Sequence, residues 1–183
     1  MSDWDDNPPG PTEFAGIRLI RVGKGQVLQG VITSPTMVGR YTHFVRRRTI
    51  PHFDHDCPEC LNGSEARWHG YISIQHLGGH VHSVLELTAL AAAPIKEFQE
   101  RHGSLRGSEL YARRVGNAPN SPVQTIVNAA DHDLRKIPQP VDLRAFLCTI
   151  WRIPLDSAKA QSEQRNDPED LAIEIGRGNG EAP

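Results

Sequence analysis

The chain of 183 residues lacks any run of eighteen apolar residues, and its first eleven residues contain neither a basic start nor an apolar stretch. Neither a membrane-spanning helix nor a secretory signal is therefore expected. Cysteine is scarce, with three residues, so a fully paired disulfide framework is excluded and a reducing, cytoplasmic setting is the simplest prediction. Aromatic residues make up only 6% of the chain, whereas 14 prolines and 16 glycines indicate many turns.

Several catalytic motifs are also absent. The sequence has no Gly-x4-Gly-Lys-Ser/Thr phosphate loop, no Gly-x-Ser-x-Gly elbow and no Gly-x-Gly-x-x-Gly fingerprint. A zinc nucleobase deaminase needs His-x-Glu upstream of Pro-Cys-x2-Cys, and no His-x-Glu precedes Cys57. We therefore predict a protein that is not an enzyme. A histidine-metal nuclease, using His52 or His55 with Asp54 and Asp56 on a second metal, stays open as a weaker alternative.

The chain has a net charge of −2, but its acidic and basic residues are unevenly distributed along the sequence. Residues 1–13 and residues 156–183 each carry a net charge of −4, and both segments are predicted to be disordered. Residues 14–155 carry 17 basic and 11 acidic side chains, a net charge of +6. This basic stretch is the predicted domain, and its charge suits contact with phosphates, although acidic tails are also common in soluble proteins.

A Cys-x2-Cys pair is the strongest motif that is present. Cys57 and Cys60 are separated by Pro58 and Glu59, and histidines lie upstream of them. Two thiolates with two imidazoles are a frequent ligand set for tetrahedral zinc, and four protein ligands indicate a structural rather than a catalytic ion. We predict Zn²⁺ bound by His43, His52, Cys57 and Cys60. Two further histidines could replace one of the predicted two: His55 and His69.

Short apolar runs broken by glycine and proline predict a mainly β domain. The expected strands lie within residues 17–31, 37–45, 67–77, 81–87, 108–115 and 123–127. A helix is expected near residues 90–103 with Pro94 in its first turn, and a short C-terminal helix at 143–151 capped by Asp142. One helix between the strands of a small barrel is the OB arrangement, so we predict an OB-like β-barrel with a zinc-binding loop inserted at about residues 43–66.

The layout resembles the zinc-containing single-stranded DNA-binding proteins of the T-even phage type. The resemblance covers about residues 40–75 and the acidic character of the C-terminal tail. It implies an OB-fold core, a zinc subdomain held by His43, His52, Cys57 and Cys60, and a tail that recruits replication partners. The family has a cysteine where this chain has His52, and its ligand spacings are longer.

Basic and aromatic residues interleave three times on the expected strands. Single strands are bound by cations that follow the phosphates and by rings on which bases stack. Each ring could instead belong to the core, and the arginines could form a solvated face. The predicted nucleic-acid-binding residues are Arg40, Tyr41, Phe44, Arg46, Arg47, Arg48, Arg67, Trp68, Tyr71, Tyr111, Arg113 and Arg114.

Together these patterns predict a single-stranded DNA-binding protein with a structural zinc, accessory to replication, recombination or a mobile element. The acid-and-apolar segment at 167–175 is expected to dock on a protein partner or to shield the basic groove. The alternative class is a zinc-knuckle adaptor that binds proteins and does not contact nucleic acid.

Overall fold

Eight strands and three helices form the part of the chain that this computed structural model describes: residues 14–154 without 47, 54, 55, 80, 117, 119 and 120. The predictions of disorder at 1–13 and 156–183 lie outside the described residues. The strands are β1 (Arg18–Ile20), β2 (Val27–Ile32), β3 (Val38–Val45), β4 (Arg48–Pro51), β5 (Arg67–His76), β6 (His82–Thr88), β7 (Glu109–Arg114) and β8 (Val123–Asn128). The helices are α1 (Pro58–Leu61), α2 (Ala89–His102) and α3 (Leu143–Trp151).

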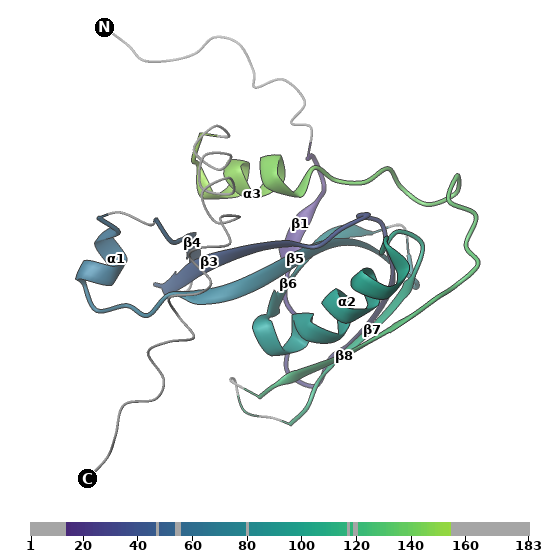
Figure 1. Cartoon of the computed structure of the whole chain (residues 1–183), viewed down its shortest axis with the longest axis horizontal. Helices are drawn as coiled ribbons and strands as arrows, with labels where there is room; N and C mark the ends of the chain where they lie inside the picture. Colours follow the sequence, from purple (N-terminus) through teal and green to yellow (C-terminus); the bar gives the residue numbers. More distant parts are fainter. Residues whose placement is uncertain are drawn as a thin grey trace, which may run out of the picture.

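All eight strands belong to one curved, mixed sheet (Figure 1). Its order is β1-β6-β5-β2-β7-β8, with β3 paired to β5 and β4 paired to β3; only β1 and β6 are parallel. The ten-residue β5 pairs along one edge with β3 near its start and with β2 near its end. The described pairings therefore form an open sheet, with β1 at one end and β8 at the other. The mainly β character is confirmed, whereas the closed OB-type barrel is not, because no described pair joins the two ends.

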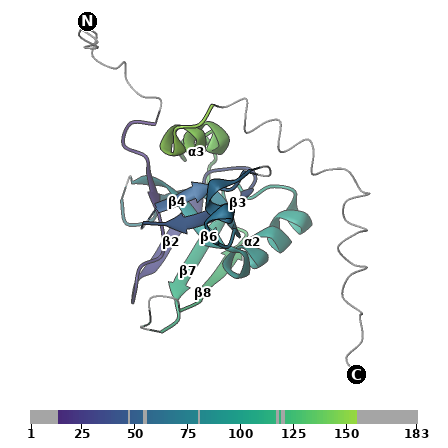
Figure 2. The ribbon, with the colours of Figure 1, turned by 90° about the vertical axis from the view of Figure 1, so that its left-hand side faces the viewer.

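The two faces of the sheet bury different helices, because successive side chains of a strand point to opposite sides. Ile72 and Ile74 of β5 pack with Ile95 and Phe98 of α2 in the larger apolar cluster. Tyr71, on the other face of the same strand, packs with α3 in a second cluster. Figure 2 shows α2 and α3 on opposite sides of the sheet.

The helix α2 begins at Ala89, within one residue of the expected start near residue 90. Thr88 is its N-cap, with its hydroxyl accepting from the amide of Ala91, and Gly103 ends it in the left-handed conformation at φ 77°. Pro94 therefore lies in the second turn, inside the helix, and its expected place in the first turn is wrong. The predicted cap of α3 is confirmed, since the Asp142 carboxylate accepts from the amide of Ala145 at 3.0 Å.

None of the described helices is long and apolar enough to cross a membrane.

Candidate metal centre and basic hairpin surface

Four side chains with soft or borderline donor atoms meet beside the β3–β4 hairpin. They are His43, His52, Cys57 and Cys60, and their ligand atoms all lie within 4.8 Å of one another. His43 Nε2 is 3.1 Å from His52 Nδ1 and 3.3 Å from Cys57 Sγ. Cys60 Sγ is 3.6 Å from His43 Nε2 and 3.5 Å from His52 Nδ1.

These separations fit one tetrahedral ion. With zinc–nitrogen bonds of about 2.0–2.1 Å and zinc–sulfur bonds of about 2.3 Å, two nitrogens lie about 3.3 Å apart and a nitrogen and a sulfur about 3.5 Å apart. The four measured distances, 3.1 to 3.6 Å, match this pattern. Two thiols and two imidazoles could therefore share a single metal ion without a large movement of the chain.

The hairpin explains why both histidines reach the same point. In the β3–β4 register His43 lies opposite Ile50, and the amide of His52 donates to the carbonyl of Tyr41 at 2.9 Å. His43 and His52 are thus diagonal neighbours on one face of the hairpin, close enough for their side chains to meet. Their rings stand edge-on with centroids 5.2 Å apart.

The cysteines are placed by a single helical turn. Asp56 adopts the left-handed conformation at φ 51°, which redirects the chain into α1 with Cys57 as N-cap and Pro58 at its first position. The amide of Leu61 donates to the carbonyl of Cys57, and the amide of Gly63 to that of Cys60. Residues three apart lie on the same side of a helical turn, so both sulfurs point toward the histidines.

The site is buried on one side and open on the other. His43 and Cys57 are buried, His52 is half-buried and Cys60 is exposed. Burial alone would raise the pKa of the Cys57 thiol, but hydrogen bonds from the backbone of Phe53, Cys60 and Glu59 outweigh it and lower this pKa to about 6. Burial and the adjacent Cys57 thiolate raise the pKa of Cys60. One sulfur is therefore ready to bind a cation at neutral pH, and the second must release a proton.

His69, one of the two alternative histidine ligands, does not join this group. Its Nδ1 lies 2.7 Å from Thr42 Oγ1, and its Nε2 is 3.8 Å from the Glu86 carboxylate. Thr42 and His43 are adjacent on β3 and point to opposite faces, so the His69 ring lies across the sheet from the metal ligands. His55 lies outside the described residues.

Exposed cations and rings gather at the end of the same hairpin. We call Phe44, Arg46 and Arg48 the hairpin tip; all three are exposed, and the Phe44 ring is 59% exposed. Arg46 adopts the left-handed conformation at φ 48° in the turn, and Arg47 lies outside the described residues. Tyr41 and Arg67 are also exposed, and Arg67 pairs with Glu65 at 3.2 Å.

Tyr71 was predicted to bind nucleic acid, and the structure does not support this role. Its side chain is fully buried beneath α3, with the Trp151 ring 5.8 Å away, so it cannot offer a face to a base in this fold. Burial and the nearby Glu86 carboxylate raise the pKa of its hydroxyl far above the usual value. The expectation failed because the sequence does not reveal that a helix more than seventy residues later covers this strand.

The other predicted residues do not form one continuous surface. Arg40 donates to the carbonyl of His52 and lies over the Trp151 ring, while Arg114 donates to the carbonyls of Val22 and Ser121. These two guanidinium groups support the fold. Strand alternation also divides the remaining residues between the two faces of the sheet: Tyr41 and Trp68 on one, Tyr111 and Arg113 on the other.

One contributor to the hairpin surface was not predicted. The guanidinium of Arg21 lies 5.1 Å from the centroid of the Phe44 ring and pairs with the buried carboxylate of Glu86 at 2.6 Å. It also donates to the hydroxyl of Thr49 on β4. This contact could not be predicted from local sequence, because Arg21 and Glu86 are 65 positions apart.

Fold and site together define a mainly β protein with a Cys/His cluster that can hold a metal ion. Comparisons of the chain with protein-family models, curated proteins and solved structures gave no match.

Proposed function

We propose that this protein binds single-stranded nucleic acid, DNA in the first instance, through a surface held in shape by a structural zinc ion. The observation that carries the proposal is the position of the hairpin tip directly beyond the candidate metal ligands. Phe44 follows His43 in the chain, and Arg46 and Arg48 follow within five residues. A metal at the base of the hairpin would therefore fix the backbone that carries these side chains.

Zinc is the ion that best suits this donor set. Two thiolates and two imidazoles in tetrahedral arrangement favour Zn²⁺ over Mg²⁺ or Ca²⁺, which prefer oxygen ligands at higher coordination number. Four protein ligands complete the coordination, which supports a structural role and a protein that is not an enzyme. The nuclease alternative needs a second metal ion, and His52, one of the residues it would use, already belongs to the four-ligand group, while Asp54 and His55 lie outside the described residues.

The chemistry of the tip suits an unpaired strand. The exposed face of Phe44 offers a plane on which a base can stack, and arginines beside it can pair with the flanking phosphates. A duplex keeps its bases stacked inside, so the ring favours single strands. Glu86 holds Arg21 against the ring, which limits the freedom that both side chains would lose on binding.

We also propose that the sheet binds nucleic acid in the manner of an OB fold. This does not require a closed barrel, because OB barrels are themselves partly open. The proposal also includes a cytoplasmic accessory role in replication, recombination or a mobile element, with the acidic segment 156–183 as a contact for a protein partner.

The test is an anisotropy titration of the full chain with fluorescent oligo(dT) and with the matching duplex, at two salt concentrations. We expect tighter binding to the single strand and a steep loss of affinity with salt. Arg46→Ala with Arg48→Ala should weaken binding about tenfold or more and reduce the salt slope by about 1–2. Lys96→Ala with Arg101→Ala, on the exposed surface of α2, is the charge-matched control.

Equal affinity for single strand and duplex, or no binding at low salt, would overturn the proposal. The second outcome would favour the adaptor class, in which the metal clip presents a surface to another protein. Metal-dependent cleavage of the oligonucleotide that disappears in His52→Ala would instead support the nuclease.

A further inference from the structure

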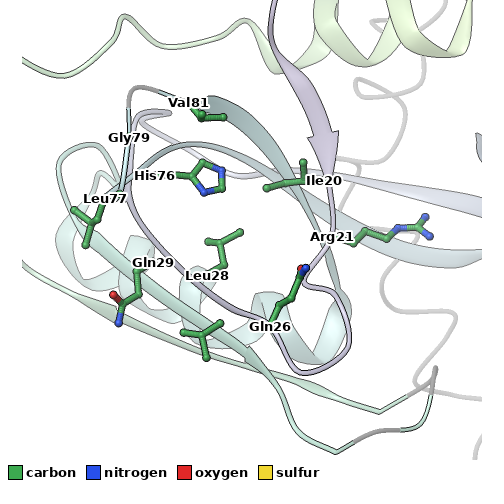
Figure 3. A pocket seen from close by; sticks show the side chains of 11 residues that line it. Ile20, Arg21, Gln26, Leu28, Gln29, His76, Leu77, Gly79 and Val81 are labelled. Carbon is green, nitrogen blue, oxygen red and sulfur yellow. The ribbon is translucent and has the colours of Figure 1, made fainter.

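A hollow of about 810 Å³ lies beside the end of β1 (Figure 3). The end of β1, the start of β2 and the β5–β6 turn frame it, and Ile20 and Leu28 form its floor. Three large apolar side chains at its edge are more than half exposed: Val27 at 51%, Leu77 at 52% and Val81 at 58%. Apolar side chains gathered around one hollow commonly mark a binding surface.

The chain around this hollow is basic. Residues 18–29 and 76–81 contain Arg18, Arg21 and Lys24 and no acidic residue. Arg113 adds a fourth cation, because it is the register partner of Val27 on the neighbouring strand. Arg21 is neutralised by Glu86, but the other three are not paired with an acid in any described ion pair. Arg21 lines the hollow, whereas Arg18, Lys24 and Arg113 belong to the chain around it. The hollow therefore suits a partner whose apolar side chains enter it and whose negative charges lie toward the surrounding cations.

The chain itself contains such a segment. Residues 167–175 read Asp-Pro-Glu-Asp-Leu-Ala-Ile-Glu-Ile, with four acids and no base. Leu171, Ile173 and Ile175 alternate with Ala172 and Glu174, which is the period-two pattern of a strand with one apolar face. The segment lies outside the described residues.

We propose that Leu171–Ile175 docks in this hollow in the free protein, with its apolar side chains against Val27, Leu77 and Val81 and its acids toward the basic rim. Sixteen residues separate it from Pro154, the last described residue. Extended chain covers about 3.3–3.6 Å per residue, so this linker reaches beyond 50 Å. A domain of this length has a radius of gyration of about 14 Å, so the hollow is within reach.

Backbone groups are also available at the hollow. Among the described strands β1 ends the sheet and pairs only with β6, so its second edge is open beside Ile20. A five-residue extended segment can add to such an edge through main-chain hydrogen bonds, while alternate side chains fill the pockets beside it.

Hydrogen exchange of the full chain, followed by mass spectrometry, tests the docking and does not depend on nucleic-acid binding. We expect the amides of residues 171–175 to exchange at least about tenfold more slowly than their intrinsic rates. Val81→Asp and Leu77→Asp should each remove this protection, because they place a charge of the same sign as the tail in the apolar hollow. Leu90→Asp is the control: Leu90 is 71% exposed in the first turn of α2 and does not line the hollow.

Three results would overturn the inference. The first is exchange of residues 171–175 at intrinsic rates in the unaltered protein. The second is protection that survives both Val81→Asp and Leu77→Asp, which would place the segment elsewhere. The third is protection that rises with protein concentration, which would show that the segment enters the hollow of a second copy.

Discussion

Replacing Cys57 with serine should release the metal and unfold residues 52–66, the part of the insertion after the β3–β4 hairpin, while leaving the rest of the domain folded. The reason lies in the packing of residues 52–66. None of the described residues in this segment belongs to either apolar cluster, and α1 buries none of its side chains. Fixing the backbone of each residue costs about 1–2 kcal/mol, and this segment has little apolar burial to offset that cost. We therefore expect the metal to supply most of its stability.

The size of the effect follows from linkage. An ion that binds only the folded insertion stabilises it by RT ln(1 + [L]/Kd), about 2.7 kcal/mol when free metal is at one hundred times Kd. The amides of Leu61, Asn62, Gly63 and Ser64 all donate to carbonyls within this turn, so they report its opening. Under those conditions their exchange should accelerate about one hundredfold in Cys57→Ser.

The measurement is hydrogen exchange with and without chelator, combined with elemental analysis for zinc. The third cysteine provides a matched control, because Cys148 is buried in α3 and belongs to neither the site nor the insertion. Cys148→Ser should retain one zinc per chain and the protection of α1. Amides of β5 at Ile72 and Ile74 should stay protected in both variants. A zinc-free wild-type protein with a protected α1 turn would refute this reasoning, as would stoichiometric zinc in Cys57→Ser.

Three further results are expected. Tyr71→Phe should be neutral or stabilising by about 1 kcal/mol in urea unfolding, because the buried hydroxyl has no hydrogen-bond partner among the described residues, whereas Tyr71→Ala should cost about 3–5 kcal/mol. Burial, and to a smaller extent the charge of Arg106, lowers the pKa of His82 below its ordinary 6.5. The unfolded chain therefore binds more protons than the folded one, and the free energy of unfolding should fall as the pH drops below about 6.5. The dependence of this free energy on pH should be weaker in His82→Gln. Gly39→Ala should destabilise the fold by about 1–3 kcal/mol in the same assay, because its Cβ would overlap the Trp68 indole.

The strand pattern was largely predictable because it depends on local alternation. The expected stretches 67–77 and 108–115 contain β5 and β7, and the stretches 81–87 and 123–127 match β6 and β8 to within one residue at each end. The glycine that ends α2 was predictable as well. The Cys-x2-Cys pair is also local, and the structure brings the predicted partners His43 and His52 to it. The four-residue β4 was missed, because Arg48–Pro51 is too short to show a period and its last residue is a proline.

Burial of individual rings was not predictable, because it depends on contacts distant in sequence. The alternation of side chains along β3 and β5 assigns each residue to one face of the sheet. Only the position of α3 on that face determines that Tyr71 is buried and Phe44 is exposed. The Arg21–Glu86 pair has the same origin, since it joins β6 to the chain just after β1. Closure of the sheet is likewise a long-range property, and the described pairings leave it open.

The position of the candidate metal explains why an arginine-rich hairpin can exist here. The proposed nucleic-acid surface needs its cations and rings exposed, so burial of these side chains would not be available to stabilise the hairpin. His43, buried near the C-terminal end of β3, and Cys57, the N-cap of α1, would allow a metal to stabilise the hairpin in place of apolar burial. Chelation should therefore lower oligonucleotide affinity in parallel with the loss of α1 protection. Affinity that is unchanged after the α1 turn has opened would show that the binding surface does not depend on the metal.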